Sequence, residues 1–170
     1  MRLFFALWPN NVIQKQFTHW AKTLELACGG RCVKTQNMHL TLAFLGNVTI
    51  ERLPELKITA NNVAAKAFNL TIEEIGYWKH PQIIYAMAKS YPTALLTLTE
   101  SLRKELSKAE FVFDSQTFNP HVTLIRKAKC LAGPRLTKPI RWHAKEWRLI
   151  QSKQTNYGVD YIPLQRWLLE

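Results

Sequence analysis

The alternation of apolar and polar residues predicts strands and helices in turn along the chain. Residues 2–8 are almost entirely apolar and are followed by a proline, which is typical of a buried strand. Apolar residues then recur at helical spacing as far as Gly29 and Gly30, and Asn10 or Asn11 can cap this helix at its start. We therefore expect a first strand followed by an amphipathic helix.

The rest of the chain continues this pattern, with several strands adjacent in sequence. We expect further strands at residues 31–34, 37–45, 68–78, 82–88, 111–113, 120–127, 143–151 and 161–168. Further helices are expected from a cap at Thr49 to about residue 66 and over residues 92–106, and a loop over residues 133–139. Because several strands follow one another without a helix between them, the order favours an α+β fold with antiparallel or mixed sheets over a doubly wound parallel sheet.

One short pattern occurs twice, in two of the expected strands. Residues 39–42 read His-Leu-Thr-Leu and residues 121–124 read His-Val-Thr-Leu, about half a chain length apart. Because residues i and i+2 of a strand point to the same face, the histidine and threonine of each motif share a face. Each motif thus has an apolar side for a core and a polar side for another purpose.

Two facing histidines suit a reaction that removes one proton and supplies another. If the two halves are duplicated lobes, a pseudo-two-fold axis brings the polar faces of the motifs together across a cleft. Histidine titrates near neutral pH, so His39 and His121 can hold different protonation states in one site. Hydrolysis of a cyclic phosphodiester needs such a pair, and the hydroxyls of Thr41 and Thr123 can donate hydrogen bonds to the phosphate oxygens.

Other interpretations of the histidines carry less weight. A single His-x-Thr strand is more often structural, so the hypothesis depends on the repetition. Metal binding is disfavoured because neither motif has a carboxylate or a third histidine beside it, and His19, His80 and His143 are interpreted as surface or structural residues. Glycine-rich dinucleotide and Walker-type loops are absent from the sequence, so we expect no cofactor of those kinds.

Composition indicates the kind of partner. The chain has 170 residues and a formal net charge of +11, which favours anionic partners such as nucleic acid or phosphorylated small molecules. The apolar start is too short for a signal peptide or a membrane span, so we expect a cytoplasmic protein without a membrane partner. Cys28, Cys32 and Cys130 form neither a zinc pattern nor a disulfide framework, and we expect buried or idle thiols in a reducing compartment.

The two motifs and their flanks resemble the two-histidine phosphoesterases, and among them the bacterial and archaeal RNA 2′,3′-cyclic phosphodiesterases, historically called 2′-5′ RNA ligases. The resemblance covers nearly the whole chain. It is carried by residues 2–7 (RLFFAL), 37–46 (NMHLTLAFLG), 118–126 (FNPHVTLIR), 149–152 (LIQS) and 161–164 (YIPL). The departures are minor, with Cys32 where an aromatic residue is frequent and Met38 where leucine is frequent.

This resemblance implies one bilobal α+β domain over residues 1–170, with pseudo-symmetric lobes around a central cleft. It implies hydrolysis of a terminal 2′,3′-cyclic phosphate to a 2′-phosphate without a metal or cofactor, and 2′-5′ ligation as the reverse type of reaction. His39 is then the general acid that protonates the leaving O3′, and His121 the general base that activates water. We expect a monomer. Its implied partner is RNA with a terminal 2′,3′-cyclic phosphate, tRNA fragments included.

Strand parity raises a question about the residues five positions after each histidine. The resemblance points to Arg126 as a phosphate contact, yet strict alternation places it on the face opposite to His121. It reaches the phosphate only if the strand ends or bulges near Ile125, or if its side chain curls around the edge. Phe44 holds the matching place after His39, where stacking on a base and packing in the core are both open interpretations.

Two alternative functions stay open. A non-catalytic RNA- or tRNA-binding protein would use the basic surface for salt-dependent binding, although binding alone would not require two imidazoles. An esterase for another cyclic phosphate, such as a small nucleotide or an ADP-ribose derivative, would use the same paired motifs.

Overall fold

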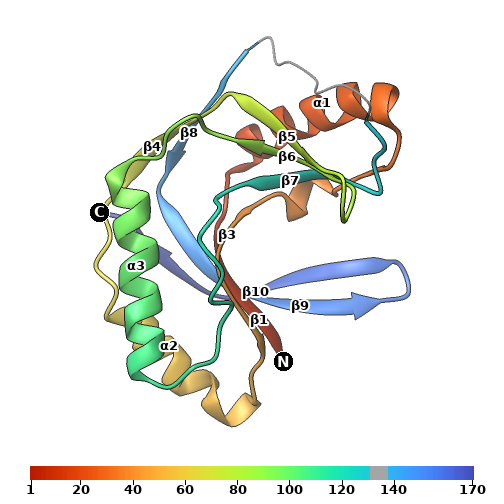
Figure 1. The fold of residues 1–170 in the computed structure, drawn as a ribbon. Helices are drawn as coiled ribbons and strands as arrows, with labels where there is room; N and C mark the ends of the chain where they lie inside the picture. Colours follow the sequence, from red (N-terminus) through yellow and green to blue (C-terminus); the bar gives the residue numbers. More distant parts are fainter. Residues whose placement is uncertain (131–137) are drawn as a thin grey trace.

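The computed structural model describes residues 1–130 and 138–170 (Figure 1). Its strands are β1 (Arg2–Leu7), β2 (Arg31–Cys32), β3 (Leu40–Asn47), β4 (Phe68–Ile72), β5 (Glu74–Trp78), β6 (Ile83–Met87), β7 (Val122–Arg126), β8 (Ile140–Ala144), β9 (Glu146–Thr155) and β10 (Gly158–Leu168). Its helices are α1 (Asn11–Cys28), α2 (Leu53–Asn61) and α3 (Thr93–Lys108), with 3₁₀ turns η1 (Thr35–Asn37) and η2 (Ile50–Arg52). The strand pairs are antiparallel, which confirms the α+β class.

Most of the strands form one open sheet that divides into two halves. The strand order is β10-β9-β1-β3-β7-β6-β5, with β2 paired to β7, while β4 and β8 form a separate two-stranded ladder. The central strands β3 and β7 are joined through one residue pair, Leu40 opposite Val122. From this junction the two halves of the sheet diverge (Figure 1).

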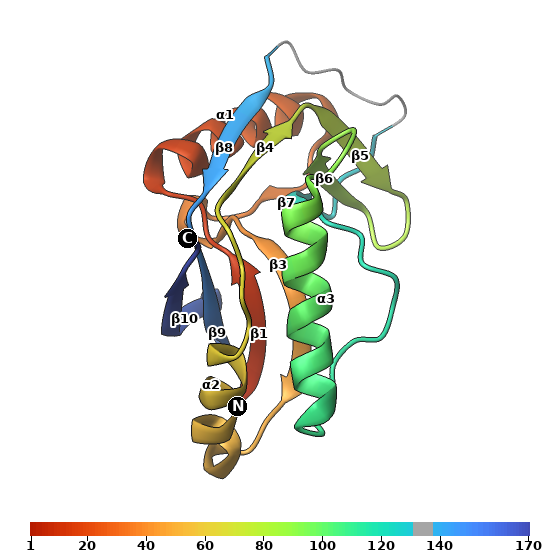
Figure 2. The ribbon, with the colours of Figure 1, turned by 90° about the vertical axis from the view of Figure 1, so that its left-hand side faces the viewer.

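Each long helix packs against the half of the sheet to which its preceding strand does not belong. Helix α1 follows β1 but contacts β2 and β7, and α3 follows β6 but contacts β3 and α2 (Figures 1 and 2). Both helices bury a regular apolar side, which includes Phe17 and Trp20 in α1 and Leu98 and Leu102 in α3. Each such side chain contributes about 1.5–3 kcal/mol of burial free energy, so these crossed helices hold the two halves together. No helix in the described part of the chain is both long enough and apolar enough to cross a membrane.

Several predicted boundaries move for local reasons. The helix expected as far as residue 66 is preceded by a 3₁₀ turn and ends at Asn61. The strand expected at residues 68–78 is interrupted at Glu73, where the chain leaves the ladder with β8 and enters the main sheet. Residues 111–113 form no strand, and the strand expected at residues 143–151 is divided between β8 and β9. Most of the loop expected at residues 133–139 lies outside the described residues.

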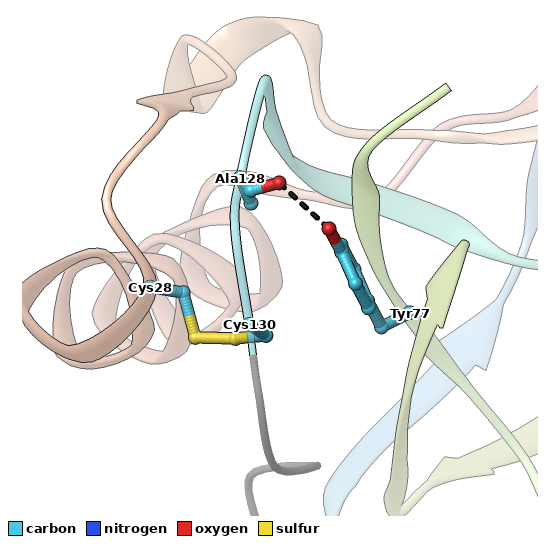
Figure 3. The surroundings of a disulfide bond; sticks show 4 residues. All are labelled: Cys28, Tyr77, Ala128 and Cys130. Carbon is cyan, nitrogen blue, oxygen red and sulfur yellow. Dashed lines mark hydrogen bonds between the residues drawn. A yellow bond between two sulfur atoms is a disulfide. The ribbon is translucent and has the colours of Figure 1, made fainter. Parts of the chain in front are cut away.

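A disulfide bond joins Cys28 at the end of α1 to Cys130 beyond β7 (Figure 3). The expectation of idle thiols is therefore wrong for these two residues, whereas the third cysteine is free. They are 102 residues apart in sequence, and the folded chain aligns them because the Lys129 amide donates to the Cys28 carbonyl over 2.9 Å. The Tyr77 hydroxyl donates to the Ala128 carbonyl over 2.9 Å, which fixes the same segment from the β5 side (Figure 3).

Removing this cross-link should destabilise the fold. We expect Cys130→Ala to lower the free energy of unfolding by about 2–4 kcal/mol, because the disulfide closes a long loop and so restricts the unfolded chain. Urea denaturation under oxidising conditions measures the loss, and Cys32→Ala is the matched control. A reductant that leaves the unfolding midpoint of the unmodified protein unchanged would contradict the prediction.

Candidate active site

A cleft of about 880 Å³ runs between the two halves of the sheet. Its walls come from β1 and β3 on one side, from β2 and β7 on the other, and from the β9–β10 hairpin. All five site residues expected from the sequence line it: His39, Thr41, His121, Thr123 and Arg126. The two motifs therefore do face one space, although the strands that carry them touch only at their first residues.

Arg126 reaches the cleft because β7 contains a bulge. Two successive residues of β6 lie opposite Thr123 and Ile125, so Leu124 is the extra residue of the bulged strand. Leu124 and Ile125 are both fully buried, and Arg126 returns to the face of His121. The bulge that strand parity required is present one position before Ile125.

The first motif is followed by a bulge of the same kind. The pairing of β3 with β1 shifts its register between Thr41 and Ala43, which leaves Leu42 as the extra residue. Leu42 and Ala43 are buried, and Phe44 returns to the cleft face. The Arg2 guanidinium lies 5.0 Å from the centroid of the Phe44 ring. Phe44 is thus a cleft residue rather than part of the main core.

The two histidines are held by the same kind of hydrogen bond. Nδ1 of His39 lies 2.6 Å from the Asn37 carbonyl oxygen, and Nδ1 of His121 lies 2.7 Å from that of Asn119. Because a carbonyl oxygen only accepts, each Nδ1 carries a proton and donates it to this bond. The second ring nitrogen, Nε2, is left on both residues to exchange a proton with a ligand.

Aromatic rings surround both imidazoles, and the sequence patterns did not single these rings out. The neighbours of His39 are Phe4, Trp8 and Tyr161, with ring centroids 4.9, 5.2 and 5.2 Å away. Those of His121 are Trp78 and Tyr85, at 4.7 and 5.5 Å. The Trp8 ring is nearly parallel to His39, with 2° between the planes, so it restricts the tilt of that imidazole.

This burial favours the neutral form of both imidazoles. Desolvation lowers the pKa of His39 from 6.5 to about 4, and the hydrogen bond to Asn37 opposes this only in part. Desolvation also lowers the pKa of His121, against the hydrogen bond to Asn119, and the positive charge of Arg126 lowers both pKa values further. In the free protein at pH 7, both histidines are therefore mostly neutral.

The charges around the cleft suit an anion. Among residues 1–130 and 138–170, the charged side chains that line it are all basic: Arg2, Arg31, Lys34 and Arg126. Cys32 also lines the cleft, but burial raises the pKa of its thiol to about 11, so the thiol stays protonated and is a poor nucleophile. The described residues contain no group of three or more His, Cys, Asp or Glu side chains placed to hold a metal ion. The other three histidines are exposed.

Several known proteins have sequences similar to this chain. A family model described as LigT like phosphoesterase matches residues 7–85. The RNA 2′,3′-cyclic phosphodiesterase of Escherichia coli (strain K12) is 31% identical over 169 residues, which cover 99% of this chain and 96% of that protein. The protein of the same name from Thermotoga maritima is 32% identical over 135 residues, or 74% of this chain and 70% of that protein.

Solved structures agree with the sequence matches. Escherichia coli LigT in its apo form has a TM-score of 0.89 at 31% identity, covering 99% of this chain and 96% of that one. The same protein complexed with 3′-AMP has a TM-score of 0.87 at 31% identity, covering 99% and 97%. The fold and the paired motifs in one cleft are those of a two-histidine phosphoesterase. Within that class, the chain belongs to the family of LigT-like phosphoesterases.

The buried His39 should make stability depend on pH. The unfolded chain takes up a proton on this residue below pH 6.5, whereas the folded protein does so only near pH 4. The free energy of unfolding should therefore fall as the pH drops from about 6.5 to about 4, with up to about 3 kcal/mol from this group. Urea denaturation across this range measures the slope. His39→Gln should reduce the slope, with the remainder coming from His121, and His143→Gln should leave it unchanged. An unchanged slope in His39→Gln would refute the assignment.

Proposed function

We propose that this protein hydrolyses the terminal 2′,3′-cyclic phosphate of RNA to a 2′-phosphate end, with His39 and His121 as acid and base. The observation that carries the proposal is the matched pair of imidazoles in one cleft, each bound through Nδ1 to its own backbone and each with Nε2 left for a proton. Two relatives that bear the name RNA 2′,3′-cyclic phosphodiesterase support the class of substrate. A LigT structure that holds 3′-AMP shows that a relative binds a nucleotide phosphorylated on its ribose.

The proposed reaction moves one proton on each side of the phosphate. His121 Nε2 accepts a proton from water as the water oxygen bonds to phosphorus. The bond from phosphorus to O3′ breaks, and O3′ takes a proton from His39 Nε2, which leaves a 2′-phosphate and a 3′-hydroxyl. The hydroxyls of Thr41 and Thr123, together with the Arg126 guanidinium, line the same cleft and can donate to the non-bridging oxygens as charge develops there.

Substrate binding would itself favour the protonated form of His39, the proposed acid. Since both imidazoles are mostly neutral in the free protein at pH 7, His39 must gain a proton before it can act as the acid. A phosphodiester carries a negative charge, and a negative charge beside an imidazole raises its pKa. Binding would therefore be coupled to proton uptake, and the proton that His121 holds after turnover must pass to solvent before the next cycle.

The proposal extends to the chain as a whole. Residues 1–170 would act as one bilobal unit, since each long helix packs on the opposite half of the sheet. The acid, the base and the phosphate donors would all come from one chain, so a monomer would suffice. The proposed steps use only these side chains and no metal, and we propose the cytoplasm as the location. Its substrates would include tRNA fragments with cyclic ends. An RNA 5′-hydroxyl in place of water would follow the same steps and form a 2′-5′ linkage.

Loss of either imidazole should nearly abolish turnover. We expect His39→Ala and His121→Ala each to lower kcat on an RNA with a 2′,3′-cyclic end by about 10²–10⁴-fold, because each removes one proton transfer. Initial rates measure the loss, circular dichroism checks the fold, and the phosphate position in the product is read by phosphorus NMR. His143→Ala, at an exposed histidine outside the cleft lining, is the control. Wild-type turnover in either cleft variant would rule out the two-histidine mechanism.

The pH dependence should differ between free and bound protein. The profile of kcat/KM reports the free protein, so we expect its maximum below pH 6.5, where the lowered pKa values of both histidines lie. The profile of kcat reports the complex, in which the anionic phosphate raises both values, so its maximum should lie at higher pH. Steady-state kinetics from pH 4 to pH 9 measure both. Coincident profiles would count against proton uptake on binding.

A further inference from the structure

The hairpin of β9 and β10 extends beyond the body of the sheet. Strand β9 is paired with β1 as far as Ser152, and residues 153–155 continue in the pairing with β10. Figure 1 shows this end of the hairpin reaching away from the rest of the sheet. We call residues 153–159 the hairpin arm, and several of its positions need explanation because they border the cleft or carry charge.

Tyr157 stands at the tip of the hairpin arm with 91% of its surface exposed, yet it also lines the cleft. The turn holds it there, since the Thr155 hydroxyl accepts from the Tyr157 amide over 3.2 Å and donates to the Gly158 carbonyl over 2.8 Å. Gly158 has a φ of 116°, a conformation that favours glycine. An aromatic ring so exposed gains much by contact with another flat surface.

The hairpin arm is fixed relative to the first histidine. The Asn37 side-chain amide donates to the Val159 carbonyl over 3.2 Å, and the Asn37 backbone carbonyl accepts the Nδ1 hydrogen bond of His39. Beyond the arm, the Tyr161 ring stands edge-on to His39. A ligand that touched both His39 and Tyr157 would therefore meet two groups whose separation is set by the fold.

Charge indicates the ligand. The charged residues lining the described cleft are basic, and the hairpin arm adds the exposed Lys153. A basic groove with an exposed aromatic ring is typical of sites for single-stranded nucleic acid, where cations follow the phosphates and rings stack on bases. We propose that Tyr157 stacks on a base of the RNA strand upstream of the terminal cyclic nucleotide. This inference rests on the proposed function and makes the hairpin arm a determinant of preference for an oligonucleotide over a mononucleotide.

Two substrates with the same reactive end test the inference. One is a tetranucleotide with a 2′,3′-cyclic phosphate, and the other is the 2′,3′-cyclic mononucleotide of the same terminal base. The quantity to compare is kcat/KM for the tetranucleotide divided by kcat/KM for the mononucleotide. We expect Tyr157→Ala to lower this ratio by about five- to a hundredfold, the usual range for loss of one base stack. Tyr157→Phe and Tyr157→Trp should keep the ratio, because they keep a ring. Leu26→Ala is the matched control, since Leu26 is also 91% exposed but lies on α1 outside the cleft lining.

The outcomes separate this inference from the function on which it rests. If Tyr157→Ala has the same ratio as the unmodified protein, the proposed stacking is wrong. This holds whether the substitution has no effect or lowers kcat/KM equally for both substrates. If the unmodified protein hydrolyses neither substrate, the proposed function is wrong. The stacking proposal is then tested by RNA binding alone. Fluorescence anisotropy of a labelled single-stranded tetranucleotide with a 2′-phosphate end should show weaker binding for Tyr157→Ala and unchanged binding for Leu26→Ala. Equal or undetectable binding by all the proteins overturns the inference.

Discussion

The strict alternation of faces along a β-strand is the constraint on which the site depends. Each motif strand must bury apolar residues on one side and present polar groups on the other, and alternation alone would return Arg126 and Phe44 to the core side. A one-residue bulge at Leu124 and another at Leu42 reset this parity. Each bulge adds a second consecutive buried residue and brings the next side chain back to the cleft. The core and the cleft are therefore built from the same short segments.

The sequence predicts what depends on local pattern and misses what depends on distant partners. The two motifs and the side of the strand that carries His39 and His121 follow from spacing of a few residues. So does a helix cap at Asn10 or Asn11, which the structure places at Asn10. The bulges depend on pairing with other strands, which the sequence does not reveal. Strand alternation could therefore say only that Arg126 reaches the cleft if the strand ends or bulges, or if its side chain curls around the edge. The Cys28–Cys130 bond was missed because the two cysteines are 102 residues apart in sequence and only the folded chain brings them together. Their spacing matches no disulfide framework that could be recognised from sequence.

The aromatic surroundings show the same limit with a chemical consequence. Trp8 directly follows β1 and Tyr161 lies in β10, far apart in sequence, yet both enclose His39, and no short pattern joins them. Their burial of the imidazole lowers its pKa, so His39 is mostly neutral at pH 7 in the free protein. A histidine in a strand could be recognised as a candidate from the sequence. Its protonation state could not, because that depends on desolvation by the folded surroundings.

The two halves of the cleft repeat the motif but differ in the residue beyond each bulge. Five positions after one histidine stands Arg126, whose charge suits a phosphate, and five positions after the other stands Phe44, with the Arg2 guanidinium against its ring. A symmetric cleft would bind a symmetric ligand, whereas a cyclic phosphate joined to a nucleoside has an anionic end and an aromatic end. The equivalent bulges place unlike side chains at equivalent positions, so one fold element can orient the phosphate on one side and the rest of the nucleotide on the other. The direction of the substrate would then decide which imidazole faces O3′ and acts as the acid.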